Sequence, residues 1–275
     1  MLLAAGAHAG WNLLAKTASG GAAFVWLGVL SGVVIWTPAL VVALFVAPGE
    51  MGAEGVVFMA GSGVLHAIYF VLLQRGYLHG DLSLVYPLAR GTGPLLATVA
   101  AILLLDERPS APALAGGGII VLAVLSLTRG TGAPHEREAI AFALLTGVSI
   151  AGYTLWDKHA VGTLDMSPVV YLYGTQVANA LVLSPYVLSH RELLADAWRS
   201  SRRQAVGVGL LSPLAYVLVL FALAEAPVSY VAPAREVSIL IAAALGATVL
   251  SEGDVKGRLA AAAAIVAGIA ALAVG

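Results

Sequence analysis

Ionisable side chains lie inside long apolar stretches of this sequence, where a charge is costly and needs a reason. Arg90 interrupts the apolar run Leu82–Pro109, and Arg235 and Glu236 interrupt a second run, Val228–Asp254. In hydrocarbon, such residues normally face a partner, a water-filled cavity or a ligand. Their chemistry therefore predicts either recognition of a polar solute or movement of a proton in apolar surroundings. In the first run, two glycines and a proline follow Arg90, and we expect a loosened backbone there.

Two acidic residues, Glu236 and Asp157, are candidate coupling sites for a proton or another cation. Burial opposes the charged form of Glu236, whereas a neighbouring arginine favours it. The sequence leaves open whether Glu236 exchanges a proton or forms an internal ion pair. Asp157 lies four residues after Tyr153, on one face of a predicted helix.

Three predicted helices carry polar and aromatic residues on one face, which together favour an internal cavity. Each residue alone is more often a satisfied packing residue than a ligand contact. The candidate binding residues are His8, Trp11, Asn12, His66, Tyr69, Tyr86, Arg90, Tyr153 and Arg235. Tyr171, Tyr173, Gln176 and Tyr216 are weaker candidates, because several lie near predicted helix ends, where interfacial aromatic residues are common.

No motif predicts an enzyme, a metal site or a cofactor. The chain has no cysteine, no P-loop and no H-E-x-x-H sequence. Ser62 and His66 raise the alternative of an intramembrane hydrolase. However, their i,i+4 spacing limits how the ring approaches the hydroxyl, and we expect no acid to orient the imidazole.

The composition indicates an integral membrane protein. Apolar residues make up 60% of 275 residues, charged residues 11%, and the net charge is −1. A soluble domain could not bury so much apolar surface, whereas a bilayer can. No basic tract predicts binding to nucleic acid.

Ten apolar segments, separated by short polar stretches, predict an all-α membrane protein with ten transmembrane helices. They cover residues 1–16, 21–47, 55–74, 83–105, 112–128, 139–160, 167–188, 205–224, 229–250 and 258–274.

Two internal similarities divide these helices into repeats of five, over residues 1–130 and 138–275. Leu2–Lys16 aligns with Leu144–Lys158, and Ala89-Arg90 aligns with Ala234-Arg235. Because five is odd, the second repeat must cross the membrane in the opposite direction. Such inverted repeats are typical of secondary transporters.

Basic residues between segments predict the orientation. Those after odd-numbered segments are Lys16, Arg75, Arg129, Arg137, Arg191, Arg199, Arg202, Arg203, Lys256 and Arg258, against Arg108 and Lys158 after even-numbered ones. The bias places the odd-numbered loops in the cytoplasm and both termini outside, in a bacterial inner membrane. The loop Ser189–Gln204 is expected to form a short amphipathic helix on the anionic leaflet.

Small residues at positions 116–118 and in Gly257–Gly268 permit close helix packing. The packing is either within one chain or across a homodimer, so a monomer and a homodimer both remain open.

HAGWNLLAK at 8–16, the stretch at 86–109 and APAREVSILIAAALGATVLSEG at 232–253 resemble the EamA-like proteins of the drug/metabolite transporter superfamily. The resemblance implies a ten-helix carrier with a central cavity opened alternately to either side. Small multidrug members of the superfamily place an essential Glu within their first helix. This chain has no acid at the middle of its first or sixth helix.

We therefore interpret the chain as a secondary transporter that exports a small polar or amphipathic metabolite by alternating access. The alternatives are a drug-like or lipid-linked substrate, the hydrolase, and a scaffold that transports nothing.

Overall fold

The computed structural model describes residues 2–46, 52–105, 110–128, 134–162, 164, 166–225, 238–246, 248–250 and 255–274. In these parts of the chain, every regular element is a helix. The helices are α1 (Leu2–Lys16), α2 (Gly21–Val46), α3 (Ala53–His79), α4 (Leu82–Leu105), α5 (Ala111–Thr128), α6 (Pro134–Gly162), α7 (Pro168–Ser189), α8 (Arg191–Glu225) and α10 (Val255–Val274). Residues 238–246 are also helical.

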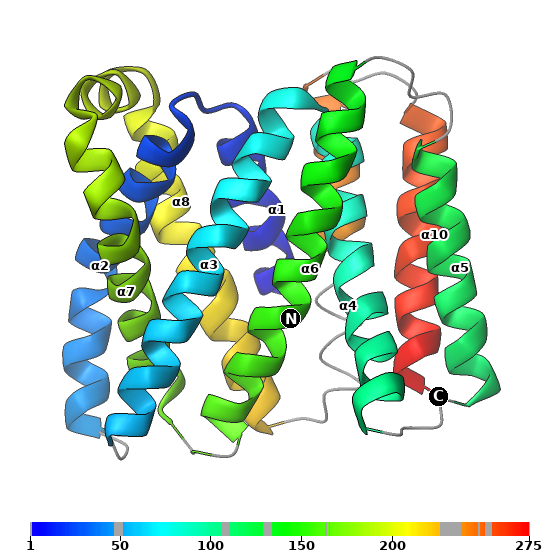
Figure 1. Ribbon diagram of the computed structural model, residues 1–275, viewed down its shortest axis with the longest axis horizontal. Coiled ribbons are helices and arrows are strands. Elements are labelled where there is room, and N and C mark those ends of the chain that lie inside the picture. Colours follow the sequence, from blue (N-terminus) through cyan, green and yellow to red (C-terminus); the bar gives the residue numbers. More distant parts are fainter. Residues whose placement is uncertain are drawn as a thin grey trace.

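The helices run alternately up and down through one bundle (Figure 1). Helices α1, α3, α5 and α7 end at the upper end of Figure 1, and α2, α4, α6 and α8 descend from it. Helix α1 starts about halfway along the bundle and rises, whereas α6, its partner in the repeat alignment, descends.

The exterior of the bundle is apolar, as expected for a protein surrounded by lipid. Large apolar side chains such as Phe45, Leu122 and Leu181 are at least half exposed. Among the described residues, four helical spans are long and apolar enough to cross a membrane: Gly21–Val46, Ala53–His79, Glu136–Gly162 and Arg191–Phe221. A soluble protein rarely exposes such surface, so the chain is an integral membrane protein.

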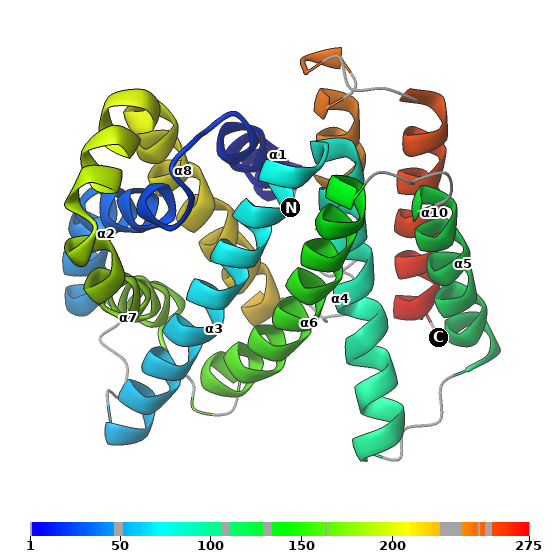
Figure 2. The ribbon, with the colours of Figure 1, turned by 45° about the horizontal axis from the view of Figure 1, so that its top comes forward.

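Helix packing divides the bundle into two parts. Helix α3 packs against α6 and α7, and α8 packs against α1 and α2. Helix α4 packs against α6 and α10, and α10 packs against α5. Figure 2 shows α5 and α10 side by side at one edge, with α4 between them and α6.

Glycines permit the closest crossings. A Cβ at Gly209 of α8 would lie 2.6 Å from the Gly32 nitrogen of α2, and a Cβ at Gly63 of α3 would lie 2.8 Å from the Asn179 nitrogen of α7. A Cβ at Gly268 of α10 would lie 2.8 Å from the Gly116 carbonyl oxygen of α5. The small residues of helices 5 and 10 therefore pack within one chain.

Helix α4 runs without interruption through residues 90–94, so the expected loosened backbone is wrong. Its glycines serve packing instead. A Cβ at Gly91 would lie 2.9 Å from Ile265 of α10, and one at Gly93 would lie 2.7 Å from Ile150 of α6.

Helix α8 contains a kink at Ser201, where φ is −133° and ψ is 18°. The segment before the kink lies across the upper end of the bundle (Figure 1), which confirms a short helix at the position of the predicted amphipathic one. The Ser201 hydroxyl accepts a hydrogen bond from the Ser19 nitrogen at 3.0 Å, and this contact ties the kink to the α1–α2 turn.

The described helices confirm nine of the predicted apolar segments, with longer bounds for α3, α6 and α8. The tenth, 229–250, is described only in part. Arg235 and Glu236 lie outside the described residues.

Candidate functional site

A small enclosed cavity lies between α1, α3, α6, α7 and α8, near the middle of the bundle. We call it the central cavity. Its walls are mostly aromatic, with a few neutral polar groups, and are formed by His8, Trp11, His66, Tyr69, Phe70, Tyr153, Leu172, Thr175, Gln176, Ser212, Pro213 and Tyr216. Its volume of about 30 Å³ gives room for about two water molecules. The bundle is therefore closed around it.

A buried carboxylate lies directly behind this cavity. Asp157 of α6 is 2% exposed and accepts two hydrogen bonds from tyrosine hydroxyls. Tyr171 of α7 donates to Oδ1 at 2.6 Å, and Tyr216 of α8 donates to Oδ2 at 2.5 Å. Two such donors stabilise a charge that burial otherwise disfavours.

His66 of α3 faces the same carboxylate. Its Nε2 lies 4.0 Å from Asp157 Oδ2, too far for a hydrogen bond but close enough for an ion pair when the ring is protonated. On the other side, Nδ1 lies 3.0 Å from the Ser62 carbonyl oxygen. Nδ1 also lies 3.1 Å from the Ser62 hydroxyl oxygen, so the ring contacts Ser62 through one nitrogen and faces Asp157 through the other. The ring of Tyr153 stacks on the imidazole at a centroid distance of 4.2 Å. We call Asp157, His66, Tyr153, Tyr171 and Tyr216 the α6 cluster.

A second polar group, which we call the α1 cluster, comprises His8, Trp11, Asn12 and Tyr77. Trp11 Nε1 donates to His8 Nδ1 at 3.2 Å, and Asn12 Nδ2 donates to the His8 carbonyl at 2.7 Å. The Tyr77 hydroxyl donates to Asn12 Oδ1 at 2.5 Å. Because His8 Nδ1 accepts a hydrogen bond from Trp11, it carries no proton, and His8 is held in a neutral form.

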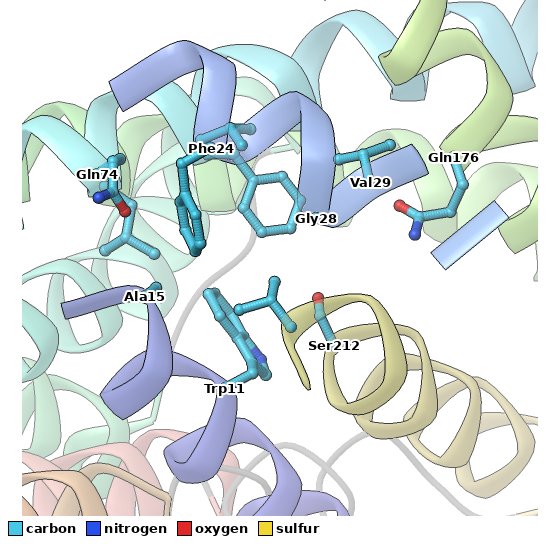
Figure 3. A pocket seen from close by; sticks show the side chains of 12 residues that line it. Trp11, Ala15, Phe24, Gly28, Val29, Gln74, Gln176 and Ser212 are labelled. Atoms are coloured by element: carbon cyan, nitrogen blue, oxygen red, sulfur yellow. The ribbon is translucent and has the colours of Figure 1, made fainter. Parts of the chain in front are cut away.

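Two smaller cavities continue the central one toward both ends of the bundle. The upper cavity, of about 20 Å³, lies between α1, α2, α3, α7 and α8. Figure 3 shows Trp11 and Ser212 facing Phe24 and Gly28 across it. The lower cavity, of about 10 Å³, lies beside Trp36 and Tyr173. Gln176 lines all three cavities.

Asn179 of α7 is fully buried, yet its side-chain oxygen and nitrogen have no hydrogen-bond partner among the described residues. It lies one and two turns after Thr175 and Tyr171 on the same helix face. A buried amide without a partner is costly. We therefore expect a water molecule, a solute or another helix arrangement to satisfy it.

The structure brings most of the predicted site residues together. His8, Trp11, His66, Tyr69 and Tyr153 line the central cavity, and Asn12 and Asp157 contact residues that line it or lie next to it.

Two predicted residues on α4 lie elsewhere. The Tyr86 hydroxyl contacts the Ser238 hydroxyl at 2.8 Å, and Arg90 is buried in a helix that packs on α6 and α10. Neither lines the three cavities.

Sequence reasoning undervalued Tyr171 and Tyr216. We expected aromatic residues near helix ends to lie at the membrane interface, but both donate hydrogen bonds to Asp157. A signal was present, since Tyr171, Thr175 and Asn179 recur every four residues on an apolar helix and predict one polar face.

The expectation for Ser62 and His66 was also wrong. Ser62 Oγ lies 3.1 Å from His66 Nδ1, and Asp157 faces the other ring nitrogen at 4.0 Å. Spacing along α3 alone did not reveal the acid, because it comes from α6.

A helical bundle with an apolar exterior and internal cavities lined by aromatic and a few polar side chains is typical of membrane transport proteins. The sequence model of the EamA-like transporter family matches residues 137–274, just over half of the chain. The chain belongs to that family and is a membrane transporter of the drug/metabolite transporter superfamily.

Among solved structures, one titled "Crystal structure of protein" is similar over 99% of this chain and 97% of its own, with a TM-score of 0.58 and 16% identity. At this identity the likeness shows the fold alone. No curated protein matches the chain.

Proposed function

We propose that this protein is a ten-helix secondary transporter of a bacterial inner membrane. It exports a small polar or amphipathic metabolite by alternating access, and Asp157 and His66 couple the flux to protons. The observation that carries the proposal is a buried carboxylate facing an imidazole beside an aromatic cavity. Ionisable residues inside a membrane protein normally mark a solute or proton pathway.

The helix arrangement supports inverted repeats. In an inverted repeat, each helix corresponds to the helix five places along the chain. The α3–α6 contact then corresponds to the α8–α1 contact, and the α3–α7 contact to the α8–α2 contact. All four contacts are present. Helices α1 and α6 run in opposite directions (Figure 1). A pseudo-symmetric pair of packing arrangements is what alternating access needs, because each repeat can adopt the other's arrangement.

The three small cavities support a pathway through the bundle. None is large enough for a metabolite, so the structure corresponds to a closed state, and transport requires the helices around Gln176 to separate. The crossings at Gly209 and Gly63 join α8 to α2 and α3 to α7 beside the cavities. They are the places where α8 can move on α2 and α3 on α7.

The coupling step follows from the geometry of the α6 cluster. With His66 neutral, the charge of Asp157 is balanced, among the described residues, by two hydroxyl donors. A proton on His66 Nε2 places a full positive charge 4.0 Å from the carboxylate. The two states differ by one charge at the cavity wall, and they therefore favour different solutes or different helix arrangements.

The row Ser62, His66 and Asp157 favours an intramembrane hydrolase as a second candidate. Its geometry is unsuited to a serine nucleophile, because Asp157 Oδ2 lies 4.0 Å from His66 Nε2, too far to orient the ring by a hydrogen bond. Ser62 is also fully buried. Turnover of a peptide or lipid that disappears in Ser62→Ala would establish the hydrolase and overturn the transporter.

The transporter is tested by a metabolite screen in proteoliposomes, with and without a pH gradient. We expect at least one solute to move faster when the gradient is imposed, and expect Asp157→Asn to remove that acceleration. Failure of every solute to move with folded protein would contradict the proposal. Arg235 and Glu236 stay predictions from the sequence, and Glu236→Gln belongs in the same screen.

Orientation is tested by single-cysteine labelling, because the chain has no cysteine of its own. Asp196, in the segment across the upper end, and Glu54, at the start of α3, are both exposed. We expect a membrane-impermeant maleimide to label Glu54→Cys but not Asp196→Cys in intact cells. The reverse pattern would place the basic end of the bundle outside.

A further inference from the structure

We infer that the basic segment at the start of α8, residues 191–203, binds anionic phospholipids, and that the bound lipid holds the α1–α2 turn in place at the upper end of the bundle. The inference goes beyond the proposed function and requires only that the chain is a membrane protein. It depends on three features: where the apolar exterior ends, which side chains the segment exposes, and how the segment contacts the turn.

The apolar exterior of the bundle ends where the basic segment begins. On α7, Tyr186 and Leu188 are exposed, and Arg191 follows three residues after Leu188. On α8, Arg203 is exposed three residues before the exposed Val206. In a membrane protein, basic and aromatic side chains collect where the hydrocarbon meets the headgroups. The segment, which lies across the upper end of the bundle (Figure 1), is therefore at the level of the lipid phosphates.

The segment exposes more positive than negative charge. Its exposed arginines are Arg191, Arg199, Arg202 and Arg203, and its acidic residues are Glu192 and Asp196. Arg191 and Trp198 are seven residues apart and share one face of the helix, where Trp198 is 46% exposed. The ion pair of Asp196 with Arg199, at 3.8 Å, is exposed on both sides, and such a pair is weak. The guanidinium groups are therefore available to phosphate, which they bind through paired hydrogen bonds.

An exposed apolar path continues from these arginines along α8. After the kink at Ser201, the exposed residues Arg202, Val206 and Leu210 lie four residues apart along one face. A ligand that matches this face has an anionic head and apolar tails in line, as a phospholipid has. Inorganic phosphate or an acidic peptide matches only the arginines.

The inner face of the segment packs on the α1–α2 turn. Ala197 is buried, and a Cβ at Gly20 would lie 2.7 Å from the Ala197 Cβ. Gly20 also has a φ of 110°, which favours glycine. The Ser19 nitrogen donates to the Ser201 hydroxyl at 3.0 Å, and the Ser19 hydroxyl lies 3.0 Å from the Ser200 hydroxyl. A lipid that fixes the segment therefore also fixes the turn.

This contact joins the two halves of the chain, because the turn belongs to residues 1–130 and the segment to residues 138–275. A lipid shifts a conformational equilibrium only when it binds one arrangement more tightly than another. The arginines meet the headgroups while the segment lies across the upper end, and the contact between Ser19 and Ser201 keeps it there. The bound lipid therefore stabilises the closed upper end.

The test measures lipid binding to the detergent-solubilised full chain by microscale thermophoresis. The probes are dioleoylphosphatidylglycerol, which is anionic, and dioleoylphosphatidylcholine, which has the same tails and no net charge. We expect the anionic lipid to bind about tenfold or more tightly, because several basic side chains near an anionic lipid each add to its affinity. Inorganic phosphate should not displace it, because phosphate lacks the tails.

A triple variant removes most of the charge of the segment: Arg191→Gln, Arg202→Gln and Arg203→Gln. We expect this variant to bind the two lipids about equally. The matched control removes three exposed cations from the end of α3 and the starts of α6 and α10: Arg75→Gln, Arg137→Gln and Lys256→Gln. The control should keep the preference for the anionic lipid.

The effect on the turn is measured by hydrogen exchange, because the donor to Ser201 is the backbone amide of Ser19. We expect the anionic lipid to slow exchange in residues 17–20 about tenfold or more, and phosphatidylcholine to leave it unchanged. Ser201→Ala removes the acceptor and keeps every arginine, so this variant should bind the lipid without protecting the turn. If Ser201→Ala does not fold, the two lipids still decide the question on the natural sequence.

The lipid site is overturned if neither lipid binds, if both bind equally, if inorganic phosphate displaces the lipid, or if the control variant loses the preference as the triple variant does. Unchanged exchange in the turn with the anionic lipid, or equal protection in Ser201→Ala, would overturn the link to the turn. Neither measurement involves flux, so failure here is distinct from failure of the proposed function.

Discussion

The α1 cluster and the α6 cluster lie on helices that the repeat alignment pairs, yet they differ in how they handle a proton. In the α1 cluster, His8 accepts from Trp11 and is held neutral, and its neighbours exchange neutral hydrogen bonds. In the α6 cluster, a buried carboxylate faces the imidazole of His66, whose Nε2 lies 4.0 Å from Asp157 Oδ2. Alignment of Leu2–Lys16 with Leu144–Lys158 places Ala15 opposite Asp157.

This difference indicates a division of work between the halves. The α1 cluster fixes one wall of the cavity and ties α1 to α3, where Lys16 also donates to the carbonyls of Tyr77 and Gly80, both at 2.7 Å. In the proposed function, the α6 cluster carries the charge that changes. In the proposed inverted repeat, the two halves supply matching scaffolds, and Asp157 in place of Ala15 supplies the proposed coupling group.

The largest effect is expected from Asp157→Asn. The amide keeps the shape of the carboxylate but not its charge, so His66 loses its counter-ion. We predict that pH-driven flux into proteoliposomes falls to the level of empty liposomes. Asp196→Asn is the matched control, because that side chain is 74% exposed, and it should leave flux unchanged. Equal flux in both variants would remove the distinction between the clusters.

Loss of either tyrosine hydroxyl should have the next largest effect. A hydrogen bond to a charged group contributes about 1.5–3 kcal/mol, so Tyr171→Phe and Tyr216→Phe should each lower pH-driven flux about tenfold. The measurement is initial flux at a fixed gradient. Tyr186→Phe is the control, since Tyr186 lies near the end of α7 and is 51% exposed. Full activity of both cavity variants would mean that Asp157 needs neither donor.

Gly63→Ala should have a smaller effect on flux and a clear one on stability. The new methyl would lie 2.4 Å from the Ala178 Cβ, so α3 and α7 must separate. Overpacking of this kind costs about 1–3 kcal/mol, and it also moves His66 relative to Tyr171. Thermal unfolding in detergent measures the loss. Gly118→Ala, which meets open space, should be neutral, and equal stability of the two variants would contradict the close crossing.

The smallest effect on transport is expected in the α1 cluster. Tyr77→Phe removes the donor to Asn12 Oδ1, which is fully buried. An unsatisfied buried acceptor costs about 1–3 kcal/mol, so the unfolding temperature should fall. The response of flux to the pH gradient should not change. A changed response would show that the α1 cluster also takes part in coupling.

Sequence periodicity predicted most of the helices but not all of their ends. Helix α3 was expected to finish near residue 74 and continues to His79, because Lys16 from another helix satisfies its final carbonyls. The polar start of α6, from Pro134, likewise extends beyond the apolar run that marks the span. Such ends depend on tertiary contacts that apolar patterning does not contain.

The candidate site was predictable where its parts share one helix. Spacing joined Tyr153 to Asp157 and placed His66 beside Tyr69, and all four meet at the central cavity or just behind it. The partners of Asp157 come from α7 and α8. Their positions along the bundle depend on how the helices cross, which spacing within one helix does not reveal. Arg90 was predicted as a site residue because burial of a cation costs free energy, but α4 packs against α6 and α10 and not around the cavities.

The central claim is that protons and solute are coupled at the α6 cluster and not at the α1 cluster. Proteoliposomes that contain a pH-sensitive dye test it directly, with equal pH on both sides and a gradient of the solute found in the flux screen. The account predicts that the solute gradient moves protons through the natural sequence and through Tyr77→Phe, and moves none through Asp157→Asn. Proton movement through Asp157→Asn at the natural rate would contradict the account.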